Sequence, residues 1–162
     1  MKICIIYHSE SGNTRYVAQH LAAACNGSLI EVCDRASYLP LARFLTWCKK
    51  ARGEEKTPIE PVSIDVTMFD IVVFGSPVWA LRPTPVIHAA IDSLIGSEGK
   101  KAVAFSTSGG TPGQTGDTFK KWIEAQGMTF AGAMDIHQKD IENEKRNEDL
   151  LSLVRSVKSG GT

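Results

Sequence analysis

The chain has 162 residues, enough for one domain with its own core, so the fold does not need disulfides or a structural metal. Its 18 lysines and arginines balance its 18 aspartates and glutamates, which argues against a nucleic-acid-binding protein, since such proteins carry a basic excess. No apolar run reaches the roughly 18 residues of a membrane span and no signal-peptide pattern opens the sequence, so we expect a cytoplasmic protein.

Short apolar runs alternate with segments of helical periodicity along the chain. The run 70–75 (DIVVFG) is typical of a parallel strand that is covered on both faces. Pro83 is expected to open the following helix, because the first helical turn does not need its missing N–H. In chain order, we predict strands over 2–7, 28–33, 70–75, 101–107 and 128–136, and helices over 13–25, 40–51, from 83, over 117–126 and up to about 157.

Five strands that alternate with helices imply βαβ units, and therefore a parallel sheet with helices on both faces. The polar, proline-bearing stretch 52–67 is interpreted as a long connection within the domain. The last residues, 159–162 (SGGT), are interpreted as a disordered tail. The sequence thus predicts a single doubly wound α/β domain over 1–158.

The four cysteines contain no CxxC pair. Cys4 and Cys33 fall in strand-like apolar runs, where cysteine usually behaves as a small buried hydrophobe. Without paired spacing, neither a metal site nor a functional disulfide has a signature here, and we predict no bound metal.

Polar residues directly follow three of the predicted strands. Because ligands of open α/β sheets bind beyond the carboxyl ends of the strands, we expect these residues to form the binding site. They are 9–14 (SESGNT), 76–83 (SPVWALRP) and 106–116 (STSGGTPGQTG).

The first of these segments ends where a helix is predicted to begin, and a helix N-terminus offers unpaired N–H groups that attract phosphate. Ser9, Ser11 and Thr14 can each donate a hydrogen bond, and Gly12 lets the backbone approach a ligand. Hydrogen bonds to a charged group contribute about 1.5–3 kcal/mol each, against about 0.3–1 kcal/mol for the helix dipole, so the hydroxyls would dominate. The alternative is a cluster that only caps the helix.

Two common phosphate motifs are absent from this segment. A Walker loop needs a lysine, and the dinucleotide fingerprint needs three glycines where only Gly12 is present. A single phosphate monoester held by neutral groups is the ligand that remains.

The segment S-x-S-G-N-T resembles the phosphate loop of the flavodoxin family, [ST]-x-[ST]-G-x-[ST] after the first strand. GSPVW resembles the family's loop after strand three, which carries a flavin-facing aromatic, and STSGG resembles its third flavin-contacting loop. The resemblance covers nearly the whole chain and implies a short-chain flavodoxin-like fold, a five-stranded sheet of order 2-1-3-4-5 and noncovalently bound FMN. The cofactor-binding residues that it implies are Ser9, Glu10, Ser11, Gly12, Asn13, Thr14, Ser76, Pro77, Val78, Trp79, Ala80, Ser106, Thr107, Ser108, Gly109 and Gly110.

Two of these segments leave alternatives open. Trp79 either stacks on the flavin, which would contribute about 0.5–1.5 kcal/mol beyond area burial, or packs beneath its own loop. Gly109 and Gly110 permit positive φ, so their N–H groups could face the ring, or the loop is simply mobile. Many family members have a Gly after strand three that lets a peptide turn toward the reduced flavin, whereas the run 78–81 (VWAL) has none.

Three features near the site have less specific signals. His8 adjoins the first of these segments and could lie near the ligand, but a histidine at a strand end is more often structural, and we interpret His8 in that way. Arg15 could reach the phosphate or point into solvent. The acidic run 135–149 is interpreted as a solvated helix face, with docking of a redox partner as the alternative.

The resemblance implies a low-potential FMN electron carrier that acts as a monomer or weak homodimer with redox proteins as donor and acceptor. The alternative is an NAD(P)H-dependent FMN or quinone reductase on the same fold, although the G-S-x-R-x-x-S type loop of those enzymes is absent. A phosphoacceptor domain would need an Asp ending strand three and a Lys ending strand four, where this chain has Gly75-Ser76 and Ser106-Thr107. The neutral formal charge departs from the acidic flavodoxins, so docking through an acidic rim is not expected.

Overall fold

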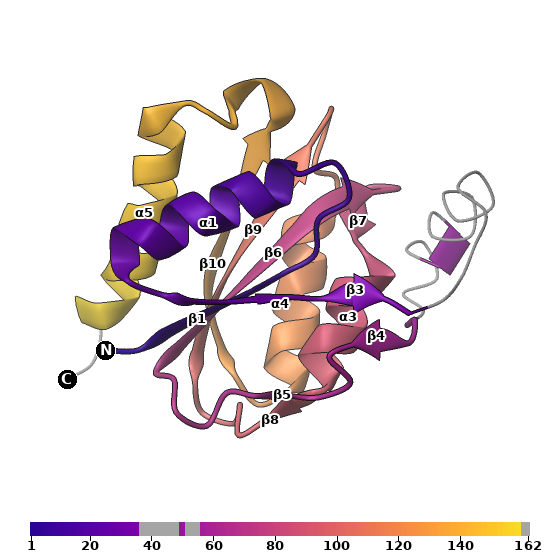
Figure 1. The fold of residues 1–162 in the computed structure, drawn as a ribbon, viewed down its shortest axis with the longest axis vertical. Coiled ribbons are helices and arrows are strands. Elements are labelled where there is room, and N and C mark those ends of the chain that lie inside the picture. The colour runs from indigo at the N-terminus through magenta and orange to yellow at the C-terminus, as the bar shows by residue number, and fades with distance from the viewer. Residues whose placement is uncertain (36–48, 51–55, 160–162) are drawn as a thin grey trace.

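A parallel sheet of five strands lies at the centre of the computed structural model, which describes residues 1–35, 49–50 and 56–159. Its strand order is β2-β1-β6-β9-β10, which confirms the predicted order 2-1-3-4-5 and the flavodoxin-like fold (Figure 1). The strands are β1 (Ile3–Tyr7), β2 (Ser28–Glu31), β6 (Ile71–Trp79), β9 (Lys101–Ser108) and β10 (Thr129–His137).

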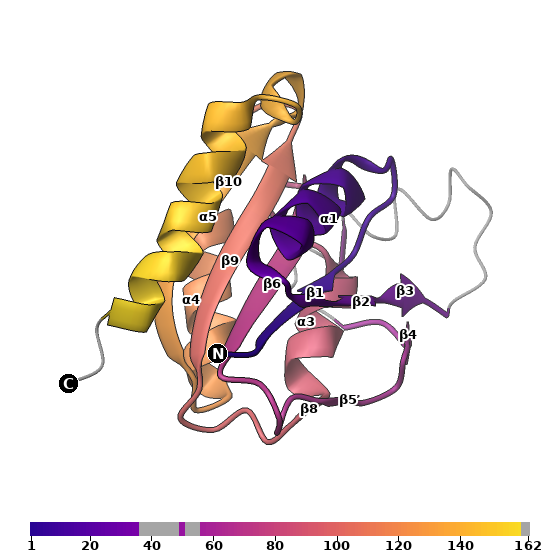
Figure 2. The same cartoon turned by 60° about the vertical axis from the view of Figure 1, so that its left-hand side comes forward.

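Helices cover both faces of the sheet, as Figure 1 and Figure 2 show. On one face lie α1 (Asn13–Cys25) and α5 (Glu144–Ser159), and on the other lie α3 (Pro85–Asp92) and α4 (Thr115–Ala125). Within the described part of the chain, no helix is both long enough and apolar enough to cross a membrane.

The core consists of two apolar layers, because successive side chains of a strand point to opposite faces. On β1, Ile6 packs in the layer beneath α3 and α4, whereas Ile5 packs beneath α1 and α5. On β9, Ala104 and Phe105 alternate in the same way. All four side chains are fully buried, which is why these strands appear in the sequence as unbroken apolar runs.

The predicted second strand is interrupted at Val32. The Val32 N–H donates to the Tyr7 carbonyl at 2.8 Å, and the chain then leaves the main sheet as β3 (Cys33–Asp34), which pairs antiparallel with β4 (Ile59–Glu60). Cys33 is therefore exposed, and the prediction of a buried thiol there is wrong. Cys4 is buried as predicted, and burial raises the pKa of its thiol to about 12.

Two predicted segments lie partly outside the described residues. Only 49–50 of the predicted helix 40–51 are described, and both are helical. The described part of the predicted connection 52–67 contains β4 and β5 (Ile64–Asp65), and β5 pairs with β8 (Leu94–Ile95) in parallel. The connection is thus fastened to the domain at two points.

The last helix continues further than expected. α5 ends at Ser159, whereas the sequence predicts an end near Val157 and a tail over 159–162. Residues 160–162 lie outside the described residues, and the domain boundaries 1–158 stay a prediction.

The third strand is longer than predicted, and its extension moves the start of the next helix. β6 continues to Trp79 and turns back as β7 (Arg82–Pro83), which pairs antiparallel with its end. Pro83 lies in this hairpin, so the prediction that it opens the helix is wrong. Thr84 is the N-cap of α3, where its hydroxyl accepts a backbone N–H of the first turn, and Pro85 fills the first turn.

The packing of β6 on β9 gives a test of the core. A Cβ at Gly75 would lie 2.3 Å from the Cζ atom of the fully buried Phe105. Gly75→Ala should therefore lower the free energy of unfolding by about 1–3 kcal/mol, as expected for overpacking. Gly116→Ala is the matched control, because its Cβ would lie 4.0 Å from Ala133, and an alanine suits helix α4 better than glycine. Urea unfolding compares the two variants, and equal stability would contradict the packing.

Candidate functional site

The ends of β1, β6 and β9 lie side by side at the carboxyl edge of the sheet. In the parallel registers Tyr7 stands opposite Gly75, and Ser76 stands opposite Ser106. The His8 N–H donates to the Gly75 carbonyl at 3.1 Å and joins the first two ends. The three polar segments therefore begin close together at the carboxyl edge of the sheet, as the sequence predicts. They are the first loop (9–14), the hairpin (76–83) and the third loop (106–116).

The first loop enters α1 through Gly12, which adopts a left-handed conformation with a φ of 96°. Gly12 has no side chain to cap the helix, and the space where its Cβ would lie is open. Ser9 accepts a hydrogen bond from the Arg15 N–H at 3.2 Å, whereas Ser11 is exposed. Capping therefore accounts for Ser9, and the N–H groups of Asn13 and Thr14 at the start of α1 remain able to meet an anion.

The first and third loops are joined by a pair of hydroxyls. Thr14 Oγ1 lies 2.8 Å from Thr107 Oγ1, and both side chains are buried. Their mutual hydrogen bond uses one of the two hydroxyl protons, so the other proton is left for a third partner. Thr14 thus has a structural contact that the sequence did not predict, and its phosphate-binding role stays a prediction.

Ser76 and Trp79 lie at opposite ends of the hairpin's first strand. Ser76 is fully buried, where its hydroxyl lies 2.9 Å from the Pro77 carbonyl and accepts from the Thr84 N–H at 3.0 Å. It therefore closes the hairpin onto the start of α3. Trp79 is half-buried and packs in part against the layer beneath α3 and α4, while Val78 pairs with Pro83. Contacts of this segment with a flavin stay a prediction.

The turn of the hairpin is made without glycine. Ala80 and Leu81 have φ values of 50° and 68°, which cost of order 1–3 kcal/mol each for residues with a side chain. The third loop supports this turn, since the Gln114 N–H donates to the Leu81 carbonyl at 2.9 Å. A Cβ at Gly113 would lie only 2.4 Å from Leu81 Cβ, so this approach requires glycine.

The third loop begins with three buried hydroxyls. Ser106 and Ser108 donate to the two carboxylate oxygens of Asp135 at 2.6 and 2.7 Å, and Thr107 points to the opposite face of β9. Gly109 and Gly110 are exposed, and neither adopts a positive φ. The loop is therefore fastened at its start and exposed at its tip.

The side chains that flank the first loop bind other parts of the protein. His8 is buried with Nδ1 2.8 Å from the Val32 carbonyl, in agreement with a structural role, and its Nε2 lies 3.4 Å from Glu10. The Arg15 guanidinium is bonded to both carboxylate oxygens of Glu31, and these hydrogen bonds raise the pKa of Arg15. Arg15 thus points toward the end of β2, and Asn13 begins α1 half-buried.

The role of Asp135 was not predicted from the sequence. The residue falls both in the predicted strand 128–136, which the structure bears out, and in the acidic run interpreted as a helix face, which is wrong for Asp135, because it lies on β10 directly opposite Ser106. The rest of the run continues through η1 (Gln138–Asp140) into α5, and much of it is exposed. A charged residue at the carboxyl end of a predicted strand was the signal that could have found it.

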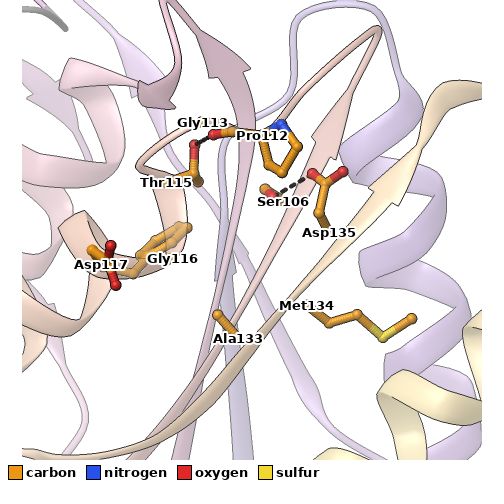
Figure 3. A pocket seen from close by; sticks show the side chains of 10 residues that line it. Ser106, Pro112, Gly113, Thr115, Gly116, Asp117, Ala133, Met134 and Asp135 are labelled. Atoms are coloured by element: carbon orange, nitrogen blue, oxygen red, sulfur yellow. Dashed lines mark hydrogen bonds between the residues drawn. The ribbon is translucent and has the colours of Figure 1, made fainter.

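A cavity of about 250 Å³ lies behind the third loop (Figure 3). Asp135 and Ser106 face each other on one side of it, and the first turn of α4, with Asp117, lies on the other. The Thr115 hydroxyl donates to the Pro112 carbonyl at 2.5 Å and fixes the turn into α4. The complete lining is Ser106, Pro112, Gly113, Thr115, Gly116, Asp117, Phe119, Ala133, Met134 and Asp135.

The sheet order and the three loops at its carboxyl edge define a flavodoxin-like protein with a site suited to a phosphate-bearing cofactor. The chain belongs to the NADPH-dependent FMN reductase family, which matches residues 1–134. The family description names FMN, in agreement with the cofactor predicted from the sequence. No curated protein matches the sequence.

Several solved structures share the fold. A flavoprotein in complex with FMN from Lactobacillus acidophilus is 23% identical, with a TM-score of 0.69 over 89% of this chain and 97% of its own. The two-electron reduced flavodoxin of Megasphaera elsdenii is 18% identical, with a TM-score of 0.61 over 93% and 96%. A flavodoxin from the domain Archaea is 16% identical, with a TM-score of 0.59 over 98% and 99%. At these identities the likeness establishes the fold.

The hydroxyl pair gives a second testable prediction. Thr14→Val or Thr107→Val alone should cost about 1–3 kcal/mol of unfolding free energy, because each leaves the other buried hydroxyl without its partner. The double variant should cost clearly less than the sum of the two, since it removes both polar groups. Thr107→Ser, which keeps the hydroxyl, is the control. Strict additivity in urea unfolding would show that the two hydroxyls do not interact.

Proposed function

We propose that this protein is an FMN-dependent electron carrier that exchanges electrons with redox proteins. The observation that carries the proposal is the start of α1, where Gly12 supplies no capping side chain and Ser9 takes only the Arg15 N–H, beside an exposed serine and a spare hydroxyl proton. Family membership supports FMN as the cofactor. FMN supplies the redox chemistry when bound, and the protein supplies binding and orientation.

Each loop has a proposed role toward the cofactor. The backbone N–H groups at the start of α1, with the hydroxyls of Ser11 and of the Thr14–Thr107 pair, hold the phosphate. Trp79 covers one face of the ring system, and Gly109 and Gly110 bring backbone groups to its edge. The first loop supplies donors for one phosphate group, whereas FAD carries two, and this favours FMN over FAD.

The surface around the site favours a particular kind of docking. The hairpin tip presents the half-exposed side chain of Leu81, and the neighbouring third loop presents Gly109 and Gly110. None of these residues carries a charge, and the whole chain is formally neutral. We therefore propose that redox partners in the cytoplasm dock by short-range contacts, with weak dependence on salt. A monomer or weak homodimer is compatible with this role.

The family match favours a second candidate, reduction of the bound flavin by NADPH within this chain. Anaerobic addition of NADPH to the FMN-loaded protein distinguishes the two. A carrier should keep its flavin absorbance until a partner reductase is added, whereas a reductase should lose it at once. Rapid bleaching by NADPH alone would overturn the carrier proposal.

Removal of a hydroxyl that donates to the phosphate should weaken the binding of FMN but not of riboflavin, which has no phosphate. Ser11→Ala should weaken FMN binding by about 1.5–3 kcal/mol, or roughly one to two orders of magnitude in Kd, and leave riboflavin binding nearly unchanged. Ser152→Ala, which removes an exposed hydroxyl from α5, is the matched control. Titration of the flavin-free protein with both ligands measures the difference. Equal losses for FMN and riboflavin would mean that the first loop does not hold the phosphate.

Trp79 should contribute to the binding of the flavin ring and not to the binding of the phosphate. Trp79→Ala is expected to weaken FMN and riboflavin alike, by about 0.5–1.5 kcal/mol or more, and to relieve quenching of flavin fluorescence. Trp79→Phe keeps an aromatic ring and should retain most of the affinity. Unchanged fluorescence and affinity in Trp79→Ala would show that the indole serves only the core.

A further inference from the structure

Asp135 is a carboxylate that reaches the proposed cofactor site from the edge strand. Its side chain accepts from Ser106 at 2.6 Å and from Ser108 at 2.7 Å, with one carboxylate oxygen for each hydroxyl. Both serines are buried at the end of β9, and Asp135 is half-buried. Figure 3 shows the carboxylate turned toward Ser106, and both residues line the cavity.

The strand register explains why the single carboxylate of Asp135 can bind two serine hydroxyls. Asp135 pairs with Ser106, and Ser108 lies two positions further on β9, on the same face of the sheet. Ser108 also lies 3.1 Å from the Gly110 carbonyl, but a hydroxyl has one proton, and the shorter contact to the charged acceptor is the stronger. The carboxylate therefore fixes the direction of both hydroxyls.

The backbone of Asp135 is held in turn by α5. Arg146 donates to the Asp135 carbonyl at 3.0 Å, so the strand end that carries the carboxylate is tied to a helix on the opposite face. The residues lining the neighbouring cavity include no lysine or arginine, and they include a second carboxylate, Asp117. Among the described residues, the hydrogen bonds of the Asp135 carboxylate come from the two serine hydroxyls.

We propose that Asp135 is a positioning residue for the cofactor: it orders the third loop from Ser106 to Gly110, and it places a negative charge next to the part of the site where the flavin ring is proposed to lie. This inference rests on the proposed function. Ordered beforehand, the loop does not have to lose conformational freedom when the ring binds, and this strengthens binding. A nearby negative charge disfavours the addition of electrons, so it lowers the reduction potential of a bound flavin.

The first test uses the protein without flavin. In Asp135→Asn the amide protons of residues 107–111 should exchange faster with solvent than in the parent chain, because two hydrogen bonds to a charge are lost. Asp117→Asn is the matched control, since it removes the same charge from the same cavity without a contact to Ser106 or Ser108 among the hydrogen bonds of the described residues. Its loop should exchange at the parental rate. Equal exchange in both variants would overturn the ordering role.

The second test measures the flavin. Asp135→Asn should weaken FMN and riboflavin by the same factor, about tenfold, because the amide has one acceptor oxygen for two hydroxyls and its bond to a hydroxyl is roughly half as strong as that of a carboxylate. The midpoint potential of FMN bound to Asp135→Asn should become less negative. Asp117→Asn should change the affinity little, and it should change the midpoint potential less than Asp135→Asn does. Unchanged affinity and potential in Asp135→Asn would overturn the inference.

A third variant, Ser108→Ala, keeps both tests informative if Asp135→Asn does not fold. Ser108→Ala removes one hydroxyl and leaves the carboxylate bonded to Ser106, so it should speed loop exchange and weaken both flavins without the full change in potential. The same potential change as in Asp135→Asn would contradict a role for the charge. If the parent chain bound no flavin, the proposed function would fail, whereas the exchange experiment on the flavin-free chain would still decide the ordering role.

Discussion

The alternation of side chains at the end of β9 is the constraint on which the site depends. Consecutive residues of a strand face opposite sides of the sheet, so Thr107 reaches the first loop while Ser106 and Ser108 reach Asp135 on the edge strand. One short stretch thereby joins elements that are far apart in the sequence. Because β9 is central and its apolar part is buried on both faces, these hydroxyls have a rigid base.

The hairpin shows how strain is accommodated next to this base. Left-handed conformations at Ala80 and Leu81 are unfavourable by themselves, yet the turn is fastened by the Gln114 N–H and by the close approach of Gly113. The absence of glycine in the hairpin is thus compensated by a glycine in the third loop. Strained backbone beside a binding site is often functional, and here it fixes the strand end that carries Trp79.

The sequence predicted the sheet order, the two covered faces and the three loops, because buried parallel strands and polar strand ends have strong local patterns. It could not predict the hairpin, since its pairing of Val78 with Pro83 depends on contacts across the turn. Cys33 was misjudged because an apolar run does not show where a chain leaves the sheet. Asp135 was missed because its partners lie 27 and 29 positions away.

The distribution of charge around the first loop has a consequence for how a phosphate would be held. Arg15 stands in the first turn of α1, but its guanidinium is tied to Glu31, and Glu10 adds a carboxylate beside His8. A phosphate in this loop would therefore be held by N–H and O–H donors more than by a cation. Such binding depends on the number and direction of the donors, and salt weakens it less than an ion pair. The buried Thr14–Thr107 contact fixes the direction of one hydroxyl donor. In a site with little net charge, a misdirected donor would not be compensated by attraction between charges, so this contact matters for phosphate binding.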